Sequence, residues 1–205
     1  MLAKTGCKGM KLTKNALRSS QGKLRRLERY LPTLQLKKGL LQQEVFKARA
    51  DSKAKADSYA SLRRELEACR ALYARARGID FSAQVRVSHV DKGVENIAGI
   101  DLPTLGSVSF EESSYSLFDT QIWVDSLVHL LRRTKEAKIE LDIAHEREGI
   151  LARELRSVTI RVNLFEKIMI PRTREEIKTI RVFLSDQELM AVARAKAAQK
   201  RLQSK

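Results

Sequence analysis

The sequence predicts a mainly α protein, a long antiparallel two-helix coiled coil formed by the N- and C-terminal helices with a short β-hairpin and connector between them. The 205-residue chain holds only 9 Gly and 3 Pro, so it has few of the residues that end helices. Towards both ends, apolar residues recur at alternating spacings of three and four. In the middle, two-residue alternation and turn-type residues replace that spacing.

The first helix is predicted from a continuous apolar stripe. Stepping alternately by three and four places mostly apolar residues on one helix face, as in a coiled-coil strand. Pro32 lies inside this pattern, and Gly78, preceded by two arginines within three residues, favours the helix end. The stripe positions are Met10, Thr13, Leu17, Ser20, Leu24, Leu27, Leu31, Leu34, Lys38, Leu41, Val45, Ala48, Ser52, Lys55, Tyr59, Leu62, Leu66, Cys69, Tyr73 and Ala76.

The middle segment predicts a hairpin. Apolar positions alternate with polar ones in a first strand at Phe81, Ala83, Val85 and Val87. The turn-type residues 91–93 predict the hairpin turn, and residues 94–102 the return strand, closed by Pro103. The glycine and serines that follow favour a loop-like connector to the next helix.

The second long helix is predicted to begin at Asp119, a suitable N-cap. Its stripe slips by one residue at Pro171, where we expect a local kink. Residues 185–188 resemble a capping box, which predicts either a helix restart or an exposed helix surface. The stripe positions are Trp123, Leu127, Leu130, Thr134, Ala137, Leu141, Ala144, Glu148, Leu151, Leu155, Val158, Val162, Phe165, Met169, and after the slip Thr173, Ile177, Ile180 and Leu184.

Together these elements predict three segments of one elongated unit: residues 1–78, 79–118 and 119–205. The net charge is +15, yet residues 80–130 hold two basic and eight acidic side chains, so both ends are basic and the middle is acidic. The basic excess favours an acidic or polyanionic partner. The longest apolar run, residues 189–193, is far shorter than the ~20 residues that span a bilayer, so a transmembrane protein is not expected.

No pattern in the chain predicts catalysis. The two cysteines, Cys7 and Cys69, and the three histidines, His89, His129 and His145, are too far apart in sequence to form a metal-ligand motif. No phosphate-binding loop of the usual spacing occurs. We therefore expect no catalytic residue, no cofactor and no metal in this chain.

Three sequence motifs, in order along the chain, carry a resemblance to a known family. The most specific is Arg161-Val162-Asn163-Leu164-Phe165-Glu166, followed by Ile170-Pro171-Arg172 and by residues 178–181. The others are Asn96-Ile97-Ala98-Gly99-Ile100 with Leu102-Pro103, and Lys11-Leu12-Thr13-Lys14. On these residues, the chain resembles the D subunits of the V-type and A-type rotary ATPases (ATP synthases), and most closely their chlamydial-type bacterial versions.

The resemblance implies a non-catalytic central-stalk rotor shaft, on the cytoplasmic side and attached to the inner membrane only through its complex. Its implied partners are the A- and B-type subunits of the hexamer, the small F-type protein of the central stalk, and the C/d-type adaptor to the membrane ring. The implied motif residues are Arg161, Val162, Asn163, Glu166, Ile170 and Pro171, with Asn96, Gly99 and Pro103 in the hairpin segment. We expect Arg161 and Asn163 to bridge the two helices and Pro171 to set a bend, although direct contact with the hexamer stays open.

A different class of function also fits a long basic helical chain. Such a chain could be a scaffold that binds anionic membrane surfaces or nucleic acid. The acidic middle and the lack of aromatic residues among the basic stretches disfavour both, so we expect no specific nucleic-acid partner.

Overall fold

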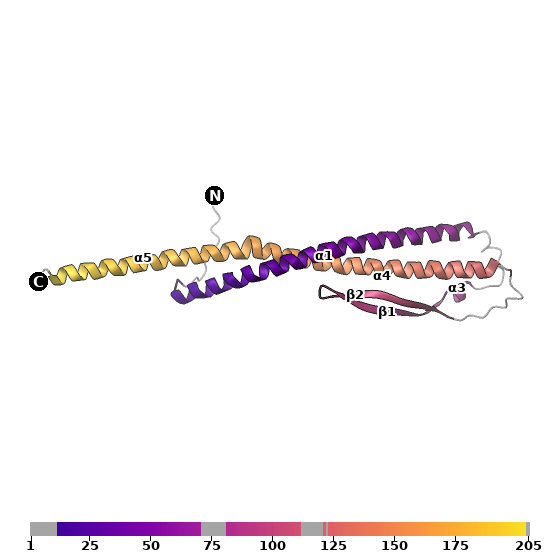
Figure 1. Ribbon diagram of the computed structural model, residues 1–205, viewed down its shortest axis with the longest axis horizontal. Helices are drawn as coiled ribbons and strands as arrows, with labels where there is room; N and C mark the ends of the chain where they lie inside the picture. Colours follow the sequence, from indigo (N-terminus) through magenta and orange to yellow (C-terminus); the bar gives the residue numbers. More distant parts are fainter. Residues whose placement is uncertain (1–11, 71–80, 112–120, 122, 204–205) are drawn as a thin grey trace. The chain divides into compact units, whose positions relative to one another are not determined.

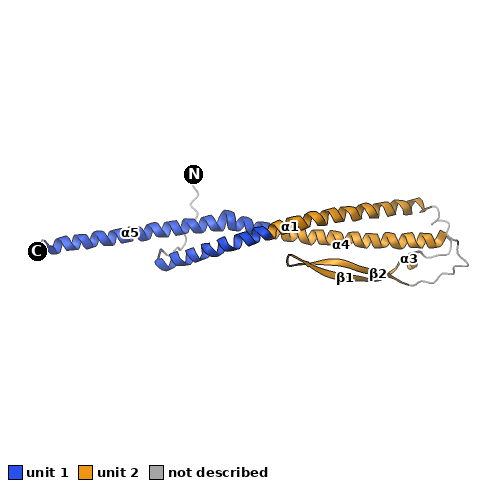
Figure 2. Cartoon of the chain, viewed as in Figure 1, with its two compact units in different colours: residues 1–36, 158–205 blue, residues 37–157 orange. Residues whose placement is uncertain are grey.

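The computed structural model describes residues 12–70, 81–111, 121 and 123–203. The chain forms two compact units, unit 1 from residues 1–36 and 158–205 and unit 2 from residues 37–157 (Figure 2). The predicted mainly α class is confirmed, with long N- and C-terminal helices and a small antiparallel sheet (Figure 1). In chain order the elements are α1 (Lys14–Ala68), α3 (Phe81–Gln84), β1 (Val87–Ile97), β2 (Ile100–Phe110), α4 (Trp123–Leu164), η1 (Phe165–Met169) and α5 (Ile170–Gln203).

Helix α1 follows the predicted stripe. Thr13 caps its start, because the Thr13 hydroxyl accepts a hydrogen bond from the Ala16 amide at 3.2 Å. Among the described stripe positions only Thr13 is exposed, so the predicted register is confirmed. Helix α1 contains Pro32 and is assigned as helix as far as Ala68, whereas the predicted end at Gly78 lies outside the described residues.

The second long helix also keeps its predicted register. Every stripe position from Trp123 to Met169 is buried or partly buried, and so are the four positions that follow the slip. The predicted slip corresponds to η1, a π-helical segment directly before Pro171. Residues 185–188 lie within α5 and are exposed, so they are helix surface and not a restart. The predicted N-cap Asp119 and the segment boundaries 78/79 and 118/119 lie outside the described residues.

The two helical strands run antiparallel in each unit. In unit 2, Arg49 of α1 pairs with Glu148 of α4 at 3.2 Å, and Ser52 Oγ lies 3.0 Å from His145 Nδ1. The partner's residue number falls as the residue number in α1 rises, which fixes the direction. In unit 1, Lys14 pairs with Glu188 at 3.6 Å and Glu28 with Arg174 at 2.8 Å, in the same sense.

The hairpin is present, but the sequence placed its turn and its first strand wrongly. The turn is formed by Ala98 and Gly99, not by residues 91–93, which lie within β1. The alternating stretch from Phe81 begins as the short helix α3, and β1 starts only at Val87. Strand β2 runs on to Phe110, through the stretch that the sequence had predicted to be connector.

Close approach between the strands explains the misread glycines. A Cβ built on Gly93 would lie 2.6 Å from the Thr104 hydroxyl oxygen, and one on Gly106 would lie 2.7 Å from Asp91 Oδ2. Glycine is therefore required by packing of the opposite strand. A register irregularity between Val90 and Lys92 absorbs the local distortion.

Helix α4 of unit 2 connects α3 and the hairpin. The cluster of Phe81, Val124, Leu127 and Val128 is buried at this end of α4. Arg132 Nε donates a hydrogen bond to the Gln84 carbonyl at 3.0 Å, and its guanidinium lies 5.4 Å from the centre of the Phe110 ring. One side chain of α4 therefore contacts both α3 and β2.

Candidate functional site

The motif segment of unit 1 has one face inside the helix pair and one face outside it. Val162 and Ile170 are buried, which places them in the seam that α4 and α5 share with α1. Arg161, Asn163 and Glu166 are exposed, and none of them makes a side-chain hydrogen bond or ion pair with a described residue. The three polar motif residues are thus available to a partner.

Pro171 explains the π-helical turn that precedes it. Proline has no amide hydrogen and its ring clashes with the carbonyl four residues earlier in a regular helix. In η1 the Ile170 amide donates to the Phe165 carbonyl, five residues earlier, so the turn is one residue wider. This extra residue keeps Ile170 and Thr173 in the seam although the sequence spacing slips.

An exposed apolar stripe lies beside the motif. Ile160, Leu164 and Ile168 are spaced by four residues and are 61%, 40% and 57% exposed. Residues four apart share a helix face, so these three side chains form a continuous strip outside the seam. The sequence analysis passed over this strip, although its spacing of four, offset from the seam positions, was readable as a second apolar face.

The end of α5 presents exposed side chains at every described position. All residues from 185 to 203 are exposed. Large apolar side chains at Leu189, Met190, Val192 and Leu202 are among them, and the last turn carries Lys200 and Arg201. This segment is a helix whose apolar and basic surface is not buried against any described residue.

The hairpin motif residues have structural roles. The Asn96 side chain accepts a hydrogen bond from the Gly99 amide at 3.1 Å and donates one to Asp101 Oδ1 at 2.6 Å. Ala98 and Gly99 both have positive φ, 54° and 76°, as a two-residue type I′ turn requires. The Pro103 carbonyl accepts from Arg147 of α4 at 3.5 Å, and the same guanidinium pairs with Glu95 at 2.8 Å. The three motif residues therefore shape the hairpin and hold it against α4.

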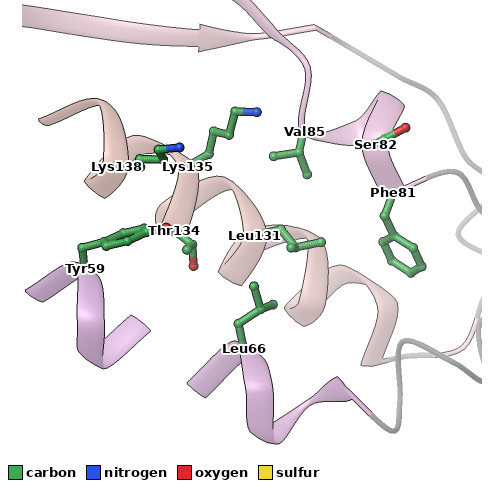
Figure 3. A pocket seen from close by; sticks show the side chains of 9 residues that line it. All are labelled: Tyr59, Leu66, Phe81, Ser82, Val85, Leu131, Thr134, Lys135 and Lys138. Carbon is green, nitrogen blue, oxygen red and sulfur yellow. The ribbon is translucent and has the colours of Figure 1, made fainter. Parts of the chain in front are cut away.

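A shallow pocket of about 260 Å³ lies in unit 2 where α1, α3 and α4 meet (Figure 3). Apolar side chains make most of its wall, and two lysines of α4 stand at one side. It is lined by Tyr59, Leu66, Phe81, Ser82, Val85, Leu131, Thr134, Lys135 and Lys138. None of these residues is a carboxylate, an imidazole or a thiol, so the lining offers apolar contact and positive charge, not a metal site.

Two searches of the described residues complete the inventory. Within residues 12–70, 81–111, 121 and 123–203 there is no group of three or more His, Cys, Asp or Glu side chains placed to hold a metal ion. In the same ranges, no helix combines the length and apolarity needed to cross a bilayer.

Known proteins resemble this chain over almost its whole length. The family model for the D subunit of ATP synthase matches residues 16–200. The V-type ATP synthase D subunit of Chlamydia felis is 44% identical over 197 residues, covering 96% of this chain and 95% of that protein. The corresponding D subunits of Chlamydia muridarum and Chlamydia pneumoniae are 42% and 39% identical over 195 residues, covering 95% of this chain and 96% and 93% of their own lengths. The motifs, the paired helices and these similarities agree, and the chain belongs to the family of ATP synthase D subunits.

Proposed function

We propose that this chain is the non-catalytic central-stalk rotor of a V/A-type rotary ATPase. In this role it transmits torque between the ring that hydrolyses or synthesises ATP and the membrane ring that translocates ions. Family membership supports a place in such a complex. The rotor role rests on the structure of the helical ends described above.

The observation that carries the proposal is the fully exposed end of α5, residues 185–203. A helix that buries no apolar face has little stability of its own in water. Its exposed Leu189, Met190 and Val192 would gain stability inside a surrounding protein wall. A sleeve of subunits around this helix end supplies that wall.

The proposed partners follow from this placement. The A- and B-type subunits would enclose the helical end of unit 1, and the small F-type protein and the C/d-type adaptor would bind elsewhere on the chain. The complex would hold the chain at the cytoplasmic face of the inner membrane, as a peripheral component. Contacts within the sleeve must be individually weak, since exposed ion pairs contribute ~0–1 kcal/mol each, and weak contacts let the rotor pass between equivalent positions.

Native mass spectrometry tests the proposed place in the complex. The chain is co-expressed with the two ring subunits of the same genome, and we expect one copy of it to three of each ring subunit. A variant that ends at residue 184 is expected to lose most of this assembly while keeping its helical circular dichroism. A folded full-length chain that forms no complex with the ring would contradict the proposal.

The net charge of +15 favours a second candidate, a basic helical scaffold on anionic vesicles or nucleic acid. Binding of that kind is dominated by counterion release and weakens steeply with added salt. A salt series with anionic vesicles and duplex DNA measures it. Binding to vesicles or DNA that persists at about 200 mM salt would favour the scaffold over the rotor.

A further inference from the structure

A groove of about 480 Å³ lies between α1 and α5 in unit 1. Polar and charged side chains form its two rims, and apolar side chains form its floor. It is lined by Gln21, Leu24, Arg25, Arg174, Ile177, Lys178, Arg181 and Val182. The lining holds four cationic side chains and no acidic one.

Three of these cations have no acidic partner in the described chain. Arg174 pairs with Glu28 at 2.8 Å, whereas Arg25, Lys178 and Arg181 form no ion pair with any described residue. All three are exposed and stand on both sides of the groove, one on α1 and two on α5. Positive charge concentrated along two walls attracts an anionic occupant between them.

The floor indicates what kind of anion fits. Leu24 is partly buried, Ile177 is buried, and Val182 is 54% exposed beside them. A polyphosphate or nucleic-acid backbone would gain nothing from these apolar side chains. A peptide segment whose carboxylates flank an apolar face satisfies rim and floor together.

We propose that this groove seats an acidic amphipathic segment of one of the surrounding ring subunits. Its carboxylates lie against Arg25, Lys178 and Arg181, and its apolar side chains cover Leu24 and Ile177. The inference rests on the proposed rotor function, because the ring supplies the segment. It names which rotor surface is recognised and the chemistry that recognises it.

Zero-length cross-linking tests the contact directly. A carbodiimide joins a lysine amine to a carboxylate only when the two are in contact, and Lys178 is the one lysine in the groove lining. In the assembled complex we expect Lys178 to be linked to an Asp or Glu of a ring subunit, within a sequence that alternates acidic and apolar residues. Lys178→Arg keeps the charge, so it should preserve assembly and remove this cross-link. Lys178 left unlinked in an assembled complex would overturn the inference.

Charge reversal measures the contribution of the groove to assembly. The triple variant Arg25→Glu, Lys178→Glu, Arg181→Glu should bind the ring roughly ten- to a hundred-fold more weakly. The matched control is Lys53→Glu, Arg133→Glu, Arg156→Glu, which changes net charge equally at exposed positions of unit 2. Circular dichroism verifies that both variants are folded.

The outcomes separate the inference from the function on which it rests. If the unmodified chain does not assemble with the ring, the proposed function fails. If it assembles and both triple variants bind as tightly as it does, the groove inference fails while the proposed function stands. Selective weakening of the groove variant, together with the Lys178 cross-link, supports both.

Discussion

At the scale of single residues, the helical seams contain polar side chains whose hydrogen bonds are satisfied. Thr134 and Thr173 are buried, and each hydroxyl donates to the carbonyl four residues earlier, at 2.7 Å in both cases. Ser52 is 4% exposed and instead reaches across to His145 of α4. A buried polar contact between helices specifies their register, because any sliding leaves the polar group unpaired.

Replacing Ser52 tests whether this contact between the helices stabilises unit 2. Ser52→Ala removes the hydrogen bond to His145 and should lower the free energy of unfolding by about 1 kcal/mol. Ser58→Ala, at an exposed position of the same helix, is the matched control and should stay within about 0.5 kcal/mol of the parent protein. Urea unfolding followed by circular dichroism measures both. Equal stability of the two variants would mean that the Ser52 contact contributes nothing.

The hairpin turn is the second feature decided by single residues. Ala98 has a φ of 54°, which suits Asn or Gly better than Ala. Ala98→Asn should therefore stabilise the hairpin by about 0.5 kcal/mol, whereas Gly99→Ala, at a φ of 76°, should destabilise it by about 1 kcal/mol. Hydrogen exchange of the β1 and β2 amides measures the local opening. Faster exchange in Ala98→Asn than in the parent protein would contradict this description of the turn.

At the scale of elements, burial made the long helices predictable from sequence. Each long helix must place an apolar stripe against the other, so the three- and four-residue spacing is imposed over many turns. The slip near Pro171 was readable for the same reason, since a seam that shifts by one residue needs one extra residue in the helix. Its form as a π-helical turn required the structure, because the sequence alone also allowed a simple kink.

The hairpin was less predictable because it buries little. Only Ile100 and Leu102 are buried hydrophobics in its two strands, so no strong alternation marks the register. Pro103 looked like a strand end, yet it pairs with Val94 inside β2. In a sheet of two strands each strand is an edge, and an edge tolerates a residue without an amide hydrogen.

Deleting one residue tests the account of η1. In a Pro171→Ala background, deletion of the exposed Lys167 should convert η1 into regular helix, restore the uninterrupted spacing of the seam, and leave the melting temperature near that of the background. Deletion of the exposed Arg156 in the same background should rotate the following seam by about 100° and lower the melting temperature by several degrees or more. Thermal unfolding measures both variants. Equal losses from the two deletions would contradict the assignment of η1 as an inserted residue.

At the scale of the whole molecule, the motifs in the sequence located the family, but the outer surfaces came from the structure. The motif residues Val162 and Ile170 could be placed in the seam from spacing. The bridging role expected for Arg161 and Asn163 has no counterpart in a hydrogen bond among the described residues. The groove between α1 and α5 could not be foreseen, because its charges come from segments about 150 positions apart in the sequence and only the antiparallel pairing brings them together.

Rotation measured in single complexes tests the central claim most directly. The ring is fixed to a surface, and a gold nanorod is attached through biotin to Lys53→Cys on α1, an exposed position, in a chain whose Cys7 and Cys69 are replaced by serine and alanine. The account predicts that ATP drives the nanorod stepwise in one direction, and that the chain ending at residue 184 loses this motion. A labelled complex that hydrolyses ATP while the nanorod stays fixed relative to the ring would contradict the rotor function.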